Sequence, residues 1–254
     1  MINSLYKTAL VTGAGQRIGR AIALDLAAGG IAVAVHYHDS SEAAEAVVEA
    51  IQAAGGRATT VGANLQDSGA VNTLIATAAA KLGGPIEILV NNASVFEKDD
   101  LINFTHESWD KHHRVNLLAP LMLIQNFAAG LPQDQPGAVV NMIDQRVLKL
   151  NPQYFSYTIA KAGLWTATQT AAQALAPNIR VNAIGPGPTL ANTDQTQQDF
   201  KNEAAAVLLG AGPTLAEITK AVRFLLETSS ITGQLIALDG GQHLAWRTKD
   251  ILED

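Results

Sequence analysis

A glycine-rich turn near the start of the chain restricts the possible folds more than any other feature of the sequence. Residues 8–11 are apolar, residues 12–19 read Thr-Gly-Ala-Gly-Gln-Arg-Ile-Gly, and residues 18–26 carry apolar side chains at helical spacing. This order predicts a strand, a tight turn and a helix. Glycines let the backbone N–H groups of such a turn approach a pyrophosphate, which the positive end of the helix dipole also attracts. The segment therefore predicts a nucleotide site in an α/β protein.

Strand and helix patterns alternate through the rest of the chain. Further strands are expected at residues 31–37, 58–61, 86–90, 138–142, 179–183 and 235–238, and helices at 41–54, 68–82, 108–129, about 157–175 and 215–226. Residues 188–212 are polar and are expected to form an irregular loop over the substrate. Repeated βα units require right-handed crossovers, which predicts a Rossmann-like, doubly wound parallel sheet of about seven strands with helices on both faces. No linker divides the chain, so we expect one domain over residues 1–254.

Composition and charge exclude several classes of protein. The 254 residues contain no cysteine, which rules out disulfides, thiolate catalysis and cysteine-ligated metals. A net charge of −6 without a basic cluster argues against nucleic acid as a partner. The apolar stretch at residues 115–124 is far shorter than the roughly 20 residues of a membrane helix, and residues 1–7 lack a signal core. We therefore expect a cytoplasmic protein that acts on a small molecule, away from membranes.

A tyrosine, a lysine and an aspartate are the strongest candidates for chemistry. Tyr157 and Lys161 stand four positions apart and project from one helix face, and Asp144 precedes the tyrosine by thirteen positions. The Lys161 ammonium can lower the pKa of the phenol and hold Tyr157 ready as a proton donor. The other interpretations are a solvated helix face for the pair and a turn cap for Asp144. In a parallel sheet these residues, the glycine turn, residues 91–94 and residues 185–187 should meet in one cleft.

The combination of motifs resembles the short-chain dehydrogenase/reductase family over nearly the whole chain. The resemblance is carried by the glycine turn, Asn91-Asn92-Ala93, Asn116, Tyr157 with Lys161, and Pro186-Gly187. It implies that Tyr157 is the acid, that Lys161 binds the nicotinamide ribose and that Asn116 helps to hold a proton-relay water. It also implies a homotetramer.

Two departures from the general family pattern resemble one branch, the pteridine reductases and bacterial dihydromonapterin reductases. Arg17 stands where the second glycine of the turn is usual, and Asp144 stands where the catalytic serine is usual. In that branch the aromatic at Phe96 stacks on the pterin. The implied substrate contacts are Arg17, Ser94, Phe96, Asp144 and Tyr157. The alternatives are a core position for Phe96 and a surface position for Arg17.

The sequence contains features that favour NAD and others that favour NADP. An acidic residue about 20 positions beyond the last glycine generally binds the ribose 2′-hydroxyl of NAD, and Asp39 fits that rule. In the family's register the corresponding position is Tyr37, so that Arg17, His38, Ser40 and Ser41 can surround a 2′-phosphate. NADP(H) is favoured and NAD(H) stays open. The implied cofactor contacts are Gly13, Gly15, Arg17, Ile18, Gly19, Tyr37, His38, Asp39, Ser40, Asn64, Leu65, Asn92, Ala93, Ser94, Tyr157, Lys161, Pro186 and Gly187.

We therefore expect an NADPH-dependent reductase of a pterin or a related conjugated heterocycle. Reduction of a C=N bond in a flat ring needs a hydride, a proton for nitrogen and an aromatic wall. The alternatives are a carbonyl or hydroxyl oxidoreductase of the same family and a non-catalytic nucleotide-binding redox sensor. A metal is not expected, because His106, His112 and His113 are interpreted as a solvated helix face. Trp109 and Trp165 are expected to be core or subunit-contact residues.

Overall fold

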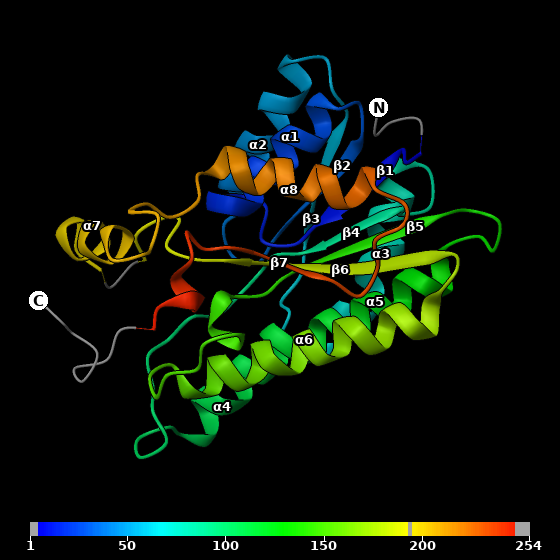
Figure 1. The fold of residues 1–254 in the computed structure, drawn as a ribbon. Coiled ribbons are helices and arrows are strands. Elements are labelled where there is room, and N and C mark those ends of the chain that lie inside the picture. Colours follow the sequence, from blue (N-terminus) through cyan, green and yellow to red (C-terminus); the bar gives the residue numbers. More distant parts are fainter. Residues whose placement is uncertain (1–4, 193–194, 247–254) are drawn as a thin grey trace, which may run out of the picture.

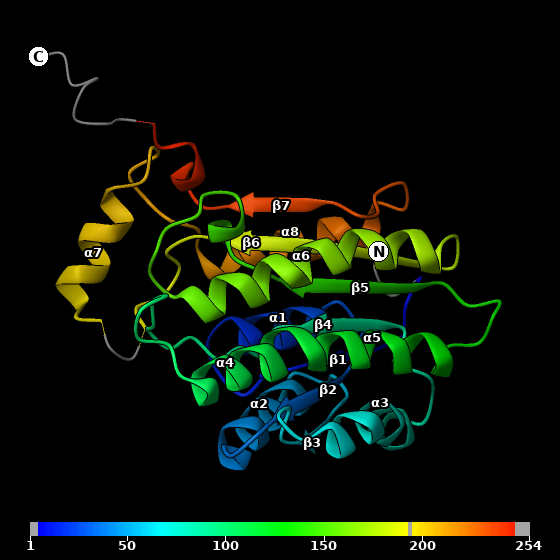
Figure 2. The same cartoon turned by 90° about the horizontal axis from the view of Figure 1, so that it is seen from below.

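The computed structural model describes residues 5–192 and 195–246 and shows a parallel sheet between two layers of helices (Figures 1 and 2). All seven strands are parallel, in the order β3-β2-β1-β4-β5-β6-β7. The predicted doubly wound fold is therefore confirmed. The strands are β1 (Thr8–Val11), β2 (Ala32–Tyr37), β3 (Ala58–Gly62), β4 (Ile88–Asn91), β5 (Gly137–Met142), β6 (Ile179–Pro186) and β7 (Leu235–Leu238). The parts of the predicted domain at residues 1–4, 193–194 and 247–254, including most of the segment examined for a signal core, lie outside the described residues.

Helices cover both faces of the sheet. One face carries α1 (Arg17–Ala28), α2 (Ser41–Ala53) and α8 (Leu215–Glu227), as Figure 1 shows. The other face carries α3 (Ser68–Leu82), α4 (His106–His113), α5 (Ala119–Gly130) and α6 (Phe155–Leu175). None of the described helices is long and apolar enough to cross a membrane.

The core consists of two layers that the strands supply with alternating side chains. Val11 and Val90 belong to the layer under α1, α2 and α8, whereas Leu10 and Leu89 belong to the layer under α3 and α5. Strands buried on both faces explain the nearly continuous apolar runs in the sequence. Because β1 pairs with β2 on one side and β4 on the other, the chain reverses its winding direction at β1. Ligands bind at the carboxyl ends of the strands next to such a point.

The prediction of one continuous α-helix at residues 108–129 is wrong, because a π-helical turn interrupts it. Helix α4 ends at His113, a π-helical turn occupies Arg114–Leu118, and α5 begins at Ala119. Pro120 lacks the N–H that a continuous α-helix would pair with the carbonyl of Asn116, so the regular ladder cannot pass through this point.

The expectation that residues 188–212 form an irregular loop is also wrong in part. Helix α7 spans Gln197–Ala205 and lies beyond the carboxyl ends of the strands (Figure 2). Thr196 and Asp199 form a capping box at its start, in which the Asp199 N–H donates to the Thr196 hydroxyl at 3.1 Å. No residue of α7 is buried, so the helix has no apolar periodicity that the sequence could reveal.

Candidate active site

The glycine turn joins β1 to α1 and leaves the start of that helix open to an anion. Gly13 has a left-handed backbone with φ +61°. A Cβ atom on Gly19 would lie 2.2 Å from the Gly13 carbonyl oxygen, so only glycine allows α1 to begin this close to the turn. Gln16 at the N-cap makes no side-chain capping bond, and the first turn of α1 has no acidic residue. The N–H groups at this helix start therefore fit a dinucleotide pyrophosphate.

A buried histidine supports the turn from the neighbouring strand. His36 on β2 accepts a hydrogen bond from the Gly13 N–H at its Nδ1 (3.0 Å), and its Nε2 lies 3.1 Å from the Ala63 carbonyl oxygen. These partners assign the proton to Nε2. Burial lowers the pKa of His36 to about 4, so the ring is neutral at physiological pH. Sequence reasoning gave His36 no role, because a histidine inside a strand has no pattern that indicates its partner.

Thr12 and Asn92 connect the ends of β1 and β4. The Thr12 hydroxyl accepts from the N–H groups of Asn92 (2.9 Å) and Ala93 (3.0 Å). The Asn92 amide nitrogen donates to the carbonyl oxygens of Thr12 (2.8 Å) and Gly13 (3.1 Å). The two predicted cofactor residues Asn92 and Ala93 therefore lie beside the glycine turn and fix its shape. Thr12 was not predicted, although it stands at the end of β1.

Asn116 holds the segment that follows β4. Its side chain is fully buried in the π-helical turn, where Oδ1 accepts from the Val95 N–H (2.8 Å) and from the Ser94 hydroxyl (3.1 Å). Its Nδ2 donates to the Val95 carbonyl oxygen at 2.8 Å. These contacts fix the loop at residues 92–105. The relay-water role implied by the resemblance stays a prediction.

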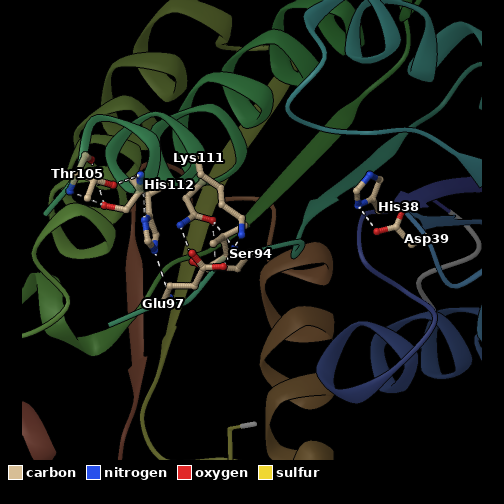
Figure 3. A network of polar contacts seen from close by, with 10 residues as sticks. His38, Asp39, Ser94, Glu97, Thr105, Lys111 and His112 are labelled. Carbon is tan, nitrogen blue, oxygen red and sulfur yellow. Dashed lines mark hydrogen bonds and ion pairs between the residues drawn. The ribbon is translucent and has the colours of Figure 1, made fainter. Parts of the chain in front are cut away.

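Helix α4 holds the same loop at a second point, Glu97, two residues after Val95 (Figure 3). His112 is fully buried, donates from Nδ1 to the Ser108 carbonyl oxygen (2.7 Å) and accepts the Glu97 N–H at Nε2 (3.2 Å). Lys111 forms an ion pair with the Glu97 carboxylate. The expectation of a solvated face is therefore wrong for His112, because the loop folds over that side of α4. The expectation of a solvated face is met at His106, whose side chain is exposed. Among the residues described, no group of three side chains could hold a metal ion.

The two tryptophans have separate surroundings. The Trp109 ring stacks on His113 with centroids 3.8 Å apart and lies 5.8 Å from the ring of Phe104. Trp165 is half-buried and packs against the small core cluster that contains Ile143. Trp165 therefore lies at the edge of the core and is not enclosed in it.

Asp144 and Tyr157 form a direct hydrogen-bonded pair at the carboxyl end of β5. The Tyr157 hydroxyl donates to Asp144 Oδ2 at 2.9 Å, and Asp144 Oδ1 accepts the Arg146 N–H at 2.8 Å. One Asp144 oxygen thus caps the short 3₁₀ helix Gln145–Val147, as the turn-cap interpretation expects, and the other contacts the phenol; a role of Asp144 in the chemistry stays a prediction. Lys161 is buried one turn beyond Tyr157 and donates to the Met142 carbonyl oxygen at 2.8 Å.

The electrostatics of this group differ from the sequence-based prediction. Burial and the Asp144 carboxylate raise the pKa of Tyr157 well above its usual value, so the prediction that Lys161 lowers that pKa is wrong for this arrangement. The ammonium contacts a backbone carbonyl instead of the phenol oxygen. Burial also raises the pKa of Asp144, and it lowers the pKa of Lys161 to about 8. At neutral pH the Tyr157 hydroxyl therefore keeps its proton and donates a hydrogen bond to Asp144.

Three further side chains form a stack beside the phenol. The Phe96 ring lies parallel to the Tyr154 ring with centroids 4.2 Å apart, and its edge contact with Tyr157 has a centroid distance of 4.7 Å. The Arg146 guanidinium lies 4.9 Å from the Tyr154 centroid. Phe96 is half-buried, so the alternative of a core aromatic does not apply. Tyr154 has a left-handed backbone with φ 56°, which is rare for a bulky residue and typical of functional sites.

Asp99 supports the start of the helix that carries Tyr157. Its Oδ1 accepts the Ser156 N–H at 3.1 Å, and its Oδ2 accepts the Ser108 hydroxyl at 3.2 Å. A carboxylate at this helix start also interacts favourably with the helix dipole. Asp99 and Tyr154 were not predicted, because both depend on the path of loops that carry no periodic pattern.

The predicted ribose and adenine contacts lie around the ends of β2 and β3. His38 and Asp39 are exposed and contact each other, with Nδ1 and Oδ2 2.9 Å apart, away from the network around Ser94 in Figure 3. Tyr37 is the last residue of β2. A Cβ atom on Gly62 would lie 2.9 Å from the Tyr37 ring, so the ring packs directly over this glycine. The Asn64 side chain accepts the Gln66 N–H at 2.9 Å. The other predicted cofactor residues in this region are Ser40 and Ser41, which follow β2, and Leu65, which follows β3 and is buried. Gly15 belongs to the glycine turn, and Ile18 lies in the first turn of α1.

Arg17 and the end of β6 approach each other on the substrate side. Arg17 has φ 54°, and its guanidinium donates to the carbonyl oxygens of Ala191 (2.7 Å) and Leu190 (3.2 Å). It thus links the glycine turn to the segment after β6, which begins at Gly187, directly after the last strand residue Pro186. A Cβ on Gly187 would lie 2.7 Å from Asp239, so this glycine is needed for close packing. Phosphate and substrate contacts of Arg17 stay a prediction.

Comparisons with known proteins agree with this arrangement. A family model described as "Enoyl-(Acyl carrier protein) reductase" matches residues 13–243. The chain is 35% identical to the 3-oxoacyl-[acyl-carrier-protein] reductase FabG of Staphylococcus aureus over 94% of this chain and 99% of that protein. Among solved structures, FolM alternative dihydrofolate reductase 1 from Brucella canis complexed with NADP has a TM-score of 0.95 and 48% identity, covering 99% and 100% of the two chains. The angucycline C-6 ketoreductase LanV with bound NADP has a TM-score of 0.88 and 33% identity, covering 94% and 96%.

Each of these matches spans more than nine-tenths of the chain. The parallel sheet, the glycine turn and the Asp144–Tyr157–Lys161 group occur together in one chain. The protein belongs to the short-chain dehydrogenase/reductase family of oxidoreductases.

Proposed function

We propose that this protein is an NADPH-dependent reductase of dihydropterins or closely related conjugated heterocycles. The observation that carries the proposal is the hydrogen bond between the Tyr157 hydroxyl and the Asp144 carboxylate, beside the half-buried Phe96 ring. A flat heterocycle with an exocyclic amino group offers a donor for a carboxylate and a face for an aromatic wall. The 48% identity to a FolM alternative dihydrofolate reductase supports the same substrate class.

The cofactor proposed is NADP(H). The turn between β1 and α1 offers uncapped N–H groups for the pyrophosphate, and His38 and Ser40 stand at the end of β2 where a 2′-phosphate is expected. The FolM and LanV structures both contain NADP. NADPH would supply the hydride, and Lys161 would bind its nicotinamide ribose.

The protein's own residues then provide the proton and orient the ring. Tyr157 carries a proton at its hydroxyl because burial and Asp144 keep its pKa high. Asp144 accepts a hydrogen bond from that hydroxyl and is available to an amino group on the substrate. Phe96 limits the positions of the ring, and its own position is fixed by the flanking contacts of Val95 with Asn116 and of Glu97 with His112.

A second candidate function is reduction of a carbonyl substrate. It is favoured by the 35% identity to FabG and by the 33% identity to the ketoreductase LanV. The residue that separates the two candidates is Asp144, because a carbonyl oxygen needs hydrogen-bond donors and a carboxylate opposes the negative charge that develops on it.

The experiment measures kcat/KM for a dihydropterin and for a simple aldehyde with NADPH, in the wild type, Asp144→Asn and Asp144→Ser. Charge-assisted hydrogen bonds are worth about 1.5–3 kcal/mol, so Asp144→Asn should lower dihydropterin reduction by at least about tenfold. Asp144→Ser should spare or raise aldehyde reduction. Equal losses on both substrates would show that Asp144 only supports the fold, and a wild type that reduces only the aldehyde would establish the second candidate.

We include a homotetramer in the proposal on the basis of the family resemblance. Exposed apolar side chains occur beside α5 and on α6, where Leu118 is 41% and Ile159 is 38% exposed. Light scattering coupled to size-exclusion chromatography measures the mass directly, and a monomer at micromolar concentration would contradict this part of the proposal.

A further inference from the structure

The guanidinium of Arg146 stands at the substrate side with its hydrogen-bonding capacity unused. Its backbone N–H donates to Asp144 Oδ1 at 2.8 Å, which fixes the residue beside the reacting pair. Within the described parts of the chain, no side-chain hydrogen bond or ion pair of Arg146 is found. An arginine side chain has five N–H donors in a planar fork.

The stack beside Arg146 gives this cation a defined position. Its guanidinium lies 4.9 Å from the Tyr154 ring centroid and 5.8 Å from that of Phe96. The two rings are themselves parallel and 4.2 Å apart. The charge also lies close enough to the reacting pair to lower the pKa of both Asp144 and Tyr157, against the larger opposite effect of burial. Arg146 is therefore at the rim of the same site.

Three other cations are paired with protein groups. Arg180 donates to the carbonyl oxygens of Leu225 (2.7 Å) and Leu226 (2.9 Å), and Arg223 pairs with Asp25. Lys149, in the same segment as Arg146, donates to the Ala245 carbonyl oxygen. A half-buried arginine beside two aromatic rings and a reacting pair, with free donors, has the chemistry of a carboxylate-binding residue.

We propose that Arg146 is a specificity-determining residue that binds a carboxylate on the tail of the substrate. The inference rests on the proposed function, because it assumes that a heterocycle occupies the space next to Tyr157 and Phe96. A tail that leaves the ring past Tyr154 reaches the guanidinium, which can bind a carboxylate through two parallel N–H bonds. The preferred substrates are then dihydropterins with an aromatic and anionic tail, as in dihydrofolate.

The experiment compares two substrates that differ in the tail. Dihydrofolate carries carboxylates, and dihydrobiopterin has a neutral side chain. Steady-state kinetics with NADPH are measured for the wild type and for Arg146→Gln, Arg146→Lys and the control Lys149→Gln, which removes a nearby positive charge outside the stack. Any general effect of the Arg146 charge on the Asp144–Tyr157 pair acts on both substrates alike. The ratio of the two kcat/KM values therefore isolates recognition of the tail.

In Arg146→Gln, the KM for dihydrofolate should rise at least about tenfold, while the KM for dihydrobiopterin changes by less than about threefold. Arg146→Lys should retain part of the preference, since it keeps the charge without the fork, and Lys149→Gln should retain all of it. An unchanged substrate ratio in Arg146→Gln, or an equal change in Lys149→Gln, overturns the inference while the proposed function stands. A wild type that reduces neither dihydropterin overturns the proposed function and this inference with it.

Discussion

Replacement of His36 should remove a defined part of the acid sensitivity of the fold. The neutral ring accepts the Gly13 N–H at Nδ1 and donates from Nε2 to the Ala63 carbonyl oxygen, and protonation of Nδ1 would remove the first of these hydrogen bonds. Burial lowers the folded-state pKa to about 4 from the ordinary value of 6.5. Between these two values the unfolded chain binds the proton and the folded chain does not, so stability falls as the pH falls.

The magnitude follows from the two pKa values. A difference of about 2.5 pKa units corresponds to about 3 kcal/mol when the pH is below both values. Between pH 7 and pH 5 the same linkage predicts a loss of about 2 kcal/mol in the free energy of unfolding. The contribution of neutral His36 is fully present above pH 6.5 and declines down to about pH 4.

Urea unfolding of the wild type and of His36→Asn at pH 7, 6 and 5 measures this contribution. Asparagine keeps an acceptor for the Gly13 N–H and does not titrate. The variant should be less stable at pH 7, and the difference from the wild type should shrink by about 2 kcal/mol at pH 5. His106→Asn serves as the control, because His106 is 92% exposed and should leave the pH dependence unchanged. A difference between wild type and His36→Asn that is the same at pH 7 and pH 5 would refute the reasoning.

Three further predictions concern the reacting group and its support. Tyr157→Phe keeps the ring and loses the proton donor, so kcat should fall by about 10²- to 10⁴-fold with little change in NADPH affinity by fluorescence titration; more than about a tenth of wild-type kcat would mean that the acid is elsewhere. Lys161 has a pKa lowered to about 8, and its charged form is the stronger hydrogen-bond donor to the nicotinamide ribose proposed above, so kcat/KM should decline above pH 8 and Lys161→Arg should move that decline to higher pH; an identical pH profile would contradict a role for the charge. His112→Phe removes the acceptor of the Glu97 N–H and should raise the KM for a dihydropterin. His112→Asn keeps an acceptor and should show a KM between those of the wild type and His112→Phe; equal KM values in the two variants would show that the hydrogen bond is unimportant.

The sequence was sufficient for the fold and for the centre of the site. Apolar runs buried on both faces and the order of βα units predicted the parallel sheet, which is confirmed. The spacing of Tyr157, Lys161 and Asp144 predicted a shared location, and the structure places the phenol and the carboxylate within hydrogen-bonding distance. These features depend on local periodicity and on the strand ends, which a sequence records directly.

The supporting residues could not be predicted in the same way. His112 looked like part of a solvated helix face because the loop that covers it, residues 92–105, has no periodic pattern. The pKa of Tyr157 depends on the depth of burial and on which atom the Lys161 ammonium contacts, and neither is visible in spacing. Helix α7 buries no residue, so only its capping box could indicate it.

The π-helical turn at Arg114–Leu118 makes the number of residues here as important as their identity. An α-helix advances about 100° per residue, so deletion of one residue from the turn would rotate everything on one side of it by that angle. Either Asn116 would turn away from Val95, or α5 would present a different face to the sheet. An alignment that closes a gap between His112 and Pro120 would therefore pair residues with different surroundings. The number of residues between His112 and Pro120 therefore shows whether two related chains share this active-site architecture, which percentage identity alone does not show.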